Sequence, residues 1–186
     1  IRAARAGEPP PSEPLGDAVA RALGCASEAR FAGPFGKGIV GDLSRVHPAE
    51  GPGLWPAQFP DTSARVVDSE RRACRLIGAA PTGTGVHIAE TYFELGQRAE
   101  IIVAVQGAHA VWVDDALVLE RLPEQWGAWP RFGARLQLGP GRHRVVARLP
   151  RAETSIRLLD ASGRPLPVVA SRDPTAGHVA VAPVVR

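Results

Sequence analysis

The chain has 186 residues and a formal net charge of +3, and Lys37 is the single lysine among its 22 basic residues. This length fits one domain with a core that needs no metal or disulfide support, and the basic residues are interspersed with acidic ones instead of forming the stripe that binds nucleic acid. No stretch approaches the roughly 18 apolar residues of a membrane-spanning helix, so membrane insertion is not expected. The scattered basic residues likewise argue against nucleic-acid binding.

The N-terminal region predicts a linker followed by a short helix. Residues 1–11 are rich in Ala, Arg and Pro and read as a disordered lead or linker. Residues 12–24 predict a short α-helix, because Ser12 is a good N-cap and Gly24 a good stop. The apolar stripe of this helix must pack either on the rest of the chain or on helices outside it. Its members are Leu15, Val19, Ala22 and Leu23.

The next region, residues 31–60, combines many Gly and Pro residues with apolar and aromatic ones. The Gly and Pro residues exclude long helices and strands, whereas the aromatic residues argue against disorder. The pattern predicts an ordered coil that lies on the β module and plugs one side of it.

From residue 65 onward, short runs with period-two alternation are separated by Gly, Pro and Asp. This pattern is typical of an antiparallel sheet with one buried face. The predicted fold is therefore mainly β, an antiparallel β-sandwich over residues 25–170, with 171–186 as a C-terminal edge strand or linker. The predicted strands are 65–67, 74–77, 86–95, 99–106, 110–113, 117–121, 131–138, 142–149, 154–160 and 166–169.

One predicted hairpin turns at Asp114-Asp115, where a two-residue turn requires positive φ and prefers Asn-Gly or Asp-Gly. Alternation places Val111, Val113, Leu117 and Leu119 on one face of this hairpin. Trp112 and Val118 are expected on the other face.

Several segments together resemble one family of β-sandwich modules. They are Ala22-Leu23-Gly24, Phe31-Ala32-Gly33-Pro34-Phe35-Gly36-Lys37-Gly38, Val46-His47-Pro48-Ala49-Glu50, Val111-Trp112-Val113-Asp114-Asp115-Ala116-Leu117-Val118, Leu138-Gly139-Pro140-Gly141-Arg142-His143-Arg144-Val145 and the closing stretch from Leu158 to Leu166. In this order they are similar to galactose-binding-like and PA14-like jelly rolls of large deltaproteobacterial proteins, which often stand beside tetratricopeptide repeats or transglutaminase-like domains. The resemblance implies a jelly-roll fold and a binding module of a larger bacterial protein.

The loop after the hairpin holds the candidate ligand-binding residues. Trp126 and Trp129 are flanked by Glu124, Gln125 and Arg131. Flat indole faces beside polar groups suit a sugar ring, whose C–H face stacks and whose hydroxyls need partners. Large aromatic residues also cover the open ends of β folds. The loop is therefore a candidate glycan platform, and the alternative is a packed plug.

Cys25 and Cys74 form the one possible disulfide of the chain. They pair in an oxidising compartment and otherwise remain free thiols. The sequence leaves the compartment open and slightly favours the cell envelope or an extracytoplasmic location over the cytoplasm. The chain starts at Ile1 and contains no Met, which indicates a fragment or a processed product.

Motifs for catalysis, metal binding and cofactors are missing from the sequence. It lacks Gly-x-Ser-x-Gly, Ser-x-x-Lys and P-loop spacing, and its five histidines lack metal-binding spacing. We therefore expect no enzyme activity, no metal site and no cofactor. The sequence predicts a non-catalytic interaction module that contacts protein segments or domains of its own or another chain, with carbohydrate binding through the Trp126/Trp129 loop as the alternative.

Overall fold

The computed structural model describes residues 15–60, 62–79, 84–121 and 133–175. These residues form the α-helix α1 (Leu15–Ala22), the 3-10 helices η1 (Val40–Ser44) and η2 (Pro48–Glu50), and ten strands. The strands are β1 (Arg30–Phe35), β2 (Arg65–Arg72), β3 (Arg75–Gly78), β4 (Val86–Leu95), β5 (Ala99–Gln106), β6 (Ala110–Val113), β7 (Ala116–Glu120), β8 (Gly133–Leu138), β9 (Gly141–Leu149) and β10 (Glu153–Asp160).

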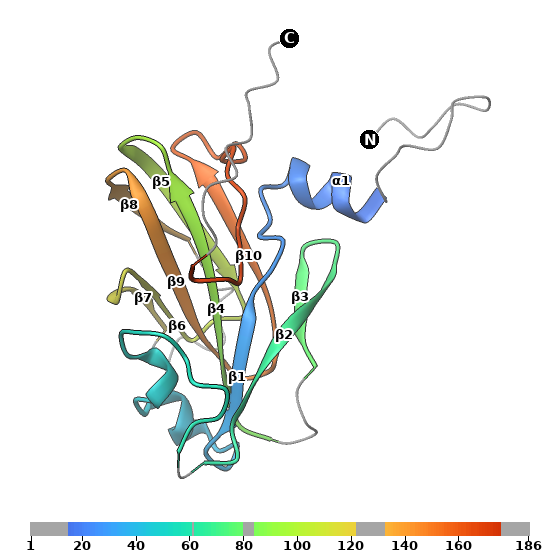
Figure 1. Cartoon of the computed structure of the whole chain (residues 1–186), viewed down its shortest axis with the longest axis vertical. Helices are drawn as coiled ribbons and strands as arrows, with labels where there is room; N and C mark the ends of the chain where they lie inside the picture. Colours follow the sequence, from blue (N-terminus) through green and yellow to red (C-terminus); the bar gives the residue numbers. More distant parts are fainter. Residues whose placement is uncertain (1–14, 61, 80–83, 122–132, 176–186) are drawn as a thin grey trace, which may run out of the picture.

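All ten described strands belong to one antiparallel sheet in the order β7-β6-β9-β4-β1-β2-β3-β10-β5-β8. The sheet curls until its end strands β7 and β8 approach each other, so it is nearly closed (Figure 1). The predicted antiparallel β fold is confirmed. The predicted two-sheet sandwich is not clearly present, because the sheet is continuous and barrel-like. Period-two alternation assigns two faces to each strand but does not tell one curled sheet from two stacked ones.

The barrel interior holds the main core. On β4, Ala89 and Phe93 point inward, whereas Ile88 precedes Ala89 in sequence and joins a second cluster outside the sheet. The same alternation on the other strands gives a continuous apolar interior. Its largest fully buried members are Phe31, Phe93, Leu76, Ile101, Leu149, Ile156, Val103, Val105 and Val145.

Strand β1 corrects the prediction of a coil that begins at residue 31, because β1 pairs with both β2 and β4 in the middle of the sheet. Gly33-Pro34 suggested a break, yet the sheet accommodates it with a register shift between Ala32 and Phe35. The Gly33–Pro34 peptide is cis, and Gly33 has φ +151°. A Cβ on Gly33 would lie 2.7 Å from His87 Nδ1, so this contact requires glycine.

The rest of the predicted coil, residues 36–60, is here called the covering segment. It contains η1 and η2 and packs on the outer face of β1, β4 and β9, at the lower left of Figure 1. The ordered coil on one side of the β module is therefore confirmed for these residues. The cluster beneath it comprises Ala32, Phe35, Leu43, Ala49, Trp55, Phe59, Ala64, Val86, Ile88 and Val146.

Strand β4 pairs with β1 only as far as Glu90, and irregular segments pair with the sheet beyond this point. Ser171 pairs with Tyr92 on β4, and Cys25 pairs with Arg157 on β10. The predicted strand 166–169 is wrong, because these residues belong to such a segment. Pro165 and Pro167 lack the N–H groups that a ladder needs.

Helix α1 occupies the middle of the predicted helix 12–24, whose first three residues lie outside the described ranges, as do residues 1–11 and 176–186. Most of its predicted apolar stripe does not pack on the β module, because Leu15, Ala22 and Leu23 are exposed and only Val19 is half-buried. The helix instead buries Ala20. None of the described helices has the length and apolar character that crossing a membrane requires.

The β6–β7 hairpin follows its predicted faces only in part. Val111 and Val113 point into the barrel core, and Trp112 packs with the outer cluster, as predicted. Leu119 packs on the core as predicted, but a bulge between Val111 and Trp112 shifts the pairing of β7, so Val118 also packs on the core and Leu117 is exposed. The extra residue in a bulge reverses the alternation beyond it, which the sequence pattern did not reveal.

Truncating Val111 or Val113 to Ala is expected to lower the free energy of unfolding by about 1–3 kcal/mol, because each side chain is buried and leaves a cavity. Chemical denaturation at constant temperature measures this loss. A matched truncation of the exposed Val169 should change the stability by about 0.5 kcal/mol or less. Equal stability of all three variants and the parent protein would contradict the placement of β6 in the core.

Candidate interaction surface

Asp42 organises the start of the covering segment. Its carboxylate accepts hydrogen bonds from the backbone N–H groups of Lys37 (2.8 Å) and Ile39 (3.1 Å). The Lys37 hydrogen bond in particular holds the pKa of Asp42 below its ordinary value. The backbone carbonyl of Asp42 lies 2.8 Å from His47 Nε2. A Cβ on Gly36 would lie 2.5 Å from the Asp42 carboxyl carbon, so glycine lets the chain wrap around this carboxylate.

A buried ion pair fastens the middle of the covering segment to β9. Arg148 donates Nε to Glu50 Oε1 and a terminal nitrogen to Glu50 Oε2, both at 2.6 Å. Its other terminal nitrogen donates to the Leu43 carbonyl, also at 2.6 Å. The guanidinium also lies 5.1 Å from the centroid of the Trp112 ring. Arg148 therefore fixes both 3-10 turns of the covering segment with charged, bidentate geometry.

A second group of buried charges crosses the outer face from β1 to β9. Glu90 on β4 is fully buried and forms ion pairs with Arg30 and Arg144, the latter at 2.8 Å. Arg144 also donates to the Gly51 carbonyl at 2.8 Å. Arg30 lies 5.5 Å from the Trp55 ring centroid. Both arginines thus connect Glu90 to the covering segment.

Glu90 and burial also shift the protonation of neighbouring groups. Burial opposes the charge of Arg144, but the adjacent Glu90 carboxylate raises the Arg144 pKa above its ordinary value. Burial, followed by the charge of Glu90, raises the pKa of Tyr92. These directions favour charged Arg144 and a neutral Tyr92 hydroxyl.

The Asp114-Asp115 turn joins the same network. Both residues have positive φ, 50° and 64°, which aspartate tolerates better than most residues. Asp114 accepts a hydrogen bond from the Arg144 backbone N–H at 2.9 Å and lies 2.7 Å from His143 Nδ1. Asp115 forms a 2.7 Å ion pair with Arg144. The carboxylates that replace the usual Asn-Gly of such a turn therefore bind arginine and histidine.

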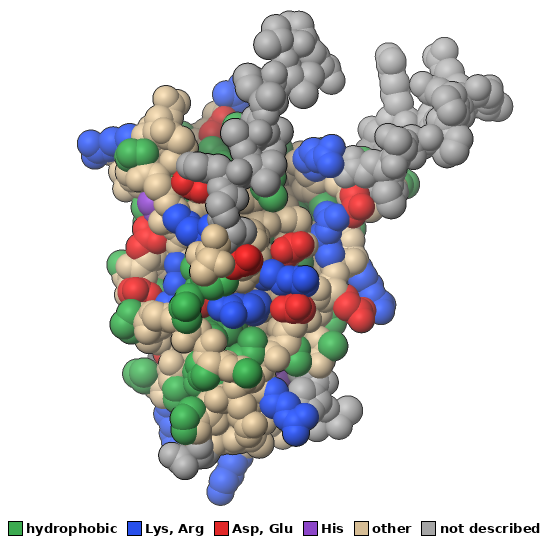
Figure 2. Space-filling model, viewed as in Figure 1, with side chains coloured by type: hydrophobic (Ala, Val, Ile, Leu, Met, Phe, Trp, Pro, Cys, Tyr) green, Lys and Arg blue, Asp and Glu red, His purple; other side chains and the backbone are tan. Residues whose placement is uncertain are grey.

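The outward side of the covering segment differs from its inward side in charge and polarity. Ile39, Val46 and Leu54 are 57%, 85% and 67% exposed. The sequence from 36 to 60 contains two acidic residues, Asp42 and Glu50, and both are buried. Its two cations other than histidine, Lys37 and Arg45, are exposed. Figure 2 shows hydrophobic and basic side chains over this lower part of the molecule, whereas acidic side chains gather mainly higher up. We call this outward side the covering face.

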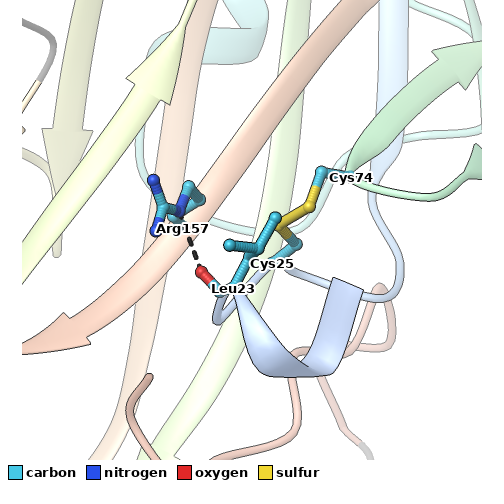
Figure 3. Close-up of a disulfide and its surroundings, with 4 residues drawn as sticks. All are labelled: Leu23, Cys25, Cys74 and Arg157. Atoms are coloured by element: carbon cyan, nitrogen blue, oxygen red, sulfur yellow. Dashed lines mark hydrogen bonds between the residues drawn. A yellow bond between two sulfur atoms is a disulfide. The ribbon is translucent and has the colours of Figure 1, made fainter. Parts of the chain in front are cut away.

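Among the predicted site residues, Cys25 and Cys74 are joined by a disulfide with Cα atoms 5.4 Å apart (Figure 3). This bond links the chain after α1 to the β2–β3 turn. The candidate ligand-binding residues fall outside the described part of the chain. These are Glu124, Gln125, Trp126, Trp129 and Arg131. Within the described residues, no group of three His, Cys, Asp or Glu side chains is arranged to hold a metal ion.

The sequence interpretation missed the two buried ion-pair systems. One signal was present, since Arg142, Arg144 and Arg148 recur on the outward face of β9. Glu90 lies 54 residues from Arg144 and Glu50 lies 98 residues from Arg148, and nothing local in the sequence connects them.

Comparisons with models of protein families, with curated proteins and with solved structures returned no match for this chain.

Proposed function

We propose that this chain is a non-catalytic interaction module of a larger bacterial protein, built on a galactose-binding-like or PA14-like jelly roll. In this proposal the covering face docks a polypeptide segment of the same or another chain. The observation that carries the proposal is the exposure of Ile39, Val46 and Leu54 on a coil whose shape is fixed by buried ion pairs. Apolar side chains on a preorganised surface favour binding, because less conformational entropy is lost on association.

The charges of the covering face indicate the chemistry of its partner. Lys37 and Arg45 are exposed there, while Asp42 and Glu50 point inward. An acidic segment with apolar side chains would match both properties. Arg45 lies 3.7 Å from Asp42, so part of its charge is already balanced, and the apolar contacts supply most of the binding energy.

We expect a photoreactive amino acid at Val46 to cross-link one defined polypeptide in cells that make the parent protein. The double substitution Ile39→Ser/Leu54→Ser should reduce that adduct by about tenfold or more, since it removes two apolar contacts of the docking surface. Both side chains are exposed, so the melting temperature should stay nearly unchanged. Mass spectrometry identifies the adduct and gives its acidic and apolar content.

A photoreactive residue at Gln137, which is exposed on β8, is the matched control and should not give the Val46 adduct. The same adducts at both positions would contradict a docking role for the covering face. A polysaccharide panel tests the alternative: saturable sugar binding lost in Trp126→Ala/Trp129→Ala would replace our proposal by carbohydrate recognition.

A further inference from the structure

Several contacts that hold helix α1 lie at the tip of the β2–β3 hairpin, and Arg157 on β10 donates a hydrogen bond to the carbonyl of Leu23, just after the helix, at 2.8 Å (Figure 3). Asp17 in the first turn of α1 forms an ion pair with Arg71 at the end of β2. A Cβ on Gly16 would lie 3.8 Å from the backbone of Ala73 in the turn. Cys25, three residues after the helix, is bonded to Cys74. The disulfide is the covalent element of this attachment (Figure 3).

The helix has little else to keep it ordered. It is eight residues long, and Ala20 is its one buried residue. Isolated helices shorter than about 12–15 residues are marginal in water. Leu15 and Leu23, which would supply most of its hydrophobic burial, are 66% and 42% exposed. Its C-terminal end is anchored to β10 through Leu23 and Gly24, so the order of the preceding turns of α1 depends on the attachment to the hairpin tip.

The disulfide is also placed where a reductant can reach it. Cys25 and Cys74 are both partly exposed, and Cys74 lies in the run Arg71-Arg72-Ala73-Cys74-Arg75. Positive charge near a cysteine stabilises the thiolate that leaves when a disulfide is attacked. Arg71 and Arg75 are paired with Asp17 and Glu153, so the partial exposure of the disulfide is the main feature that favours exchange, with Arg72 as the further nearby charge in the sequence.

We propose that Cys25–Cys74 is a thiol–disulfide exchange site, and that its reduction releases α1 from the β2–β3 hairpin. A thiolate of a small or protein dithiol attacks Sγ of Cys25, the Cys25–Cys74 bond breaks, and Cys74 leaves as a thiolate that takes a proton from water. The second thiol of the reductant then displaces Cys25 from the mixed disulfide. The reductant ends as a disulfide, and two electrons reduce the protein to two thiols.

Reduction releases the helix but leaves the barrel intact. The segment after α1 is held to β10 by backbone hydrogen bonds, from Ala26 N to the Ile156 carbonyl (2.7 Å) and from Leu158 N to the Gly24 carbonyl (2.8 Å). These bonds do not depend on the sulfur atoms. The oxidised form presents Leu15 and Ala22 on an ordered helix, and the reduced form does not. This redox control is independent of the covering face.

Hydrogen–deuterium exchange with and without dithiothreitol tests the release of α1 on reduction in the purified chain. Alkylation and mass spectrometry should show an intact disulfide before treatment and two thiols after it, in the absence of denaturant. We expect amides of α1 to exchange about tenfold faster or more in the reduced protein, because a short helix without its tether opens often. Amides of β4 and β9 should keep their protection.

The double substitution Cys25→Ser/Cys74→Ser should reproduce the fast exchange of α1 without reductant, and dithiothreitol should then have no further effect. Asp17→Asn keeps the disulfide and should preserve most of the protection, because the pair with Arg71 is partly exposed and weak. The proposal is overturned by free thiols in the native protein, by a disulfide that resists reduction until the barrel unfolds, or by unchanged α1 exchange after reduction.

Discussion

Glu50→Gln is expected to lower the free energy of unfolding by about 3–5 kcal/mol, the usual cost of removing one partner of a buried ion pair. The substituted amide would keep the shape of the side chain but leave the charge of Arg148 uncompensated, and the side chains of Glu50 and Arg148 are only 4% and 5% exposed in the native protein. One of the two hydrogen bonds that Arg148 donates to this side chain would also be lost, because an amide NH2 group cannot accept it, and the other would be weakened. Chemical denaturation of the purified variant measures the loss.

A matched exposed pair provides the control. Arg135 and Glu100 are 3.0 Å apart on β8 and β5, but their side chains are 62% and 36% exposed. Glu100→Gln should therefore cost about 1 kcal/mol or less. The double substitution Glu50→Leu/Arg148→Met, which removes both charges together, should cost less than Glu50→Gln. Equal losses for Glu50→Gln and Glu100→Gln would show that Arg148 and Glu50 do not form a buried pair.

The buried ion pairs of Arg144 and Arg148 restrict the conformation of the covering segment. Two 3-10 turns and many glycines give residues 36–60 little regular backbone hydrogen bonding of their own. Arg148 and Arg144 supply it by donating to the carbonyls of Leu43 and Gly51. Because buried charges are costly when misplaced, they permit few alternative conformations of the coil. The positions of Ile39, Val46 and Leu54 on the covering face are fixed in this way.

The sequence predicts the strands well where a short apolar run is bounded by turn residues. Strands β4, β5 and β6 have the predicted bounds, because each is rich in β-branched or aromatic residues and is followed directly by Gly or Asp. Prediction failed at β1, where Gly33-Pro34 looks like a break but occupies a register shift in the sheet. It also failed at 166–169, where prolines interrupt an apolar run that does not form a ladder.

The covering face could not be predicted in detail from the sequence, because it depends on contacts between residues that are far apart in the chain. The packing of residues 36–60 on the β module followed from their aromatic content, but the identity of the side chains that remain exposed did not. Alternation on β9 identifies Arg144 and Arg148 as outward-facing, and an outward-facing side chain is ordinarily exposed to solvent. They are buried because the covering segment lies over them, and Leu43 in it is 105 residues from Arg148 along the chain. A local pattern carries no information on such a cover.

Glu90→Gln is expected to lower the free energy of unfolding by about 3–5 kcal/mol or more, because it leaves two arginines without their common carboxylate. Glu90 is fully buried and contacts Arg30 and Arg144. The loss should spread beyond the sheet, since Arg144 also binds the Gly51 carbonyl and Arg30 lies against Trp55. Denaturant unfolding measures the global loss, and hydrogen exchange of residues 36–60 measures the loosening of the covering segment.

Asp115→Asn is the control for Glu90→Gln, because Asp115 pairs with the same Arg144 but its side chain is 44% exposed. Water can replace part of this interaction, so the expected cost is about 1 kcal/mol or less, and exchange of the covering segment should stay slow. The comparison separates burial from charge pairing, since both substitutions remove one carboxylate from Arg144. A Glu90→Gln variant as stable as Asp115→Asn, with unchanged exchange in residues 36–60, would mean that Glu90 and its two arginines do not hold the covering segment. The preorganisation of the covering face would then have to come from the Arg148–Glu50 pair and from the apolar cluster around Trp55 and Phe59.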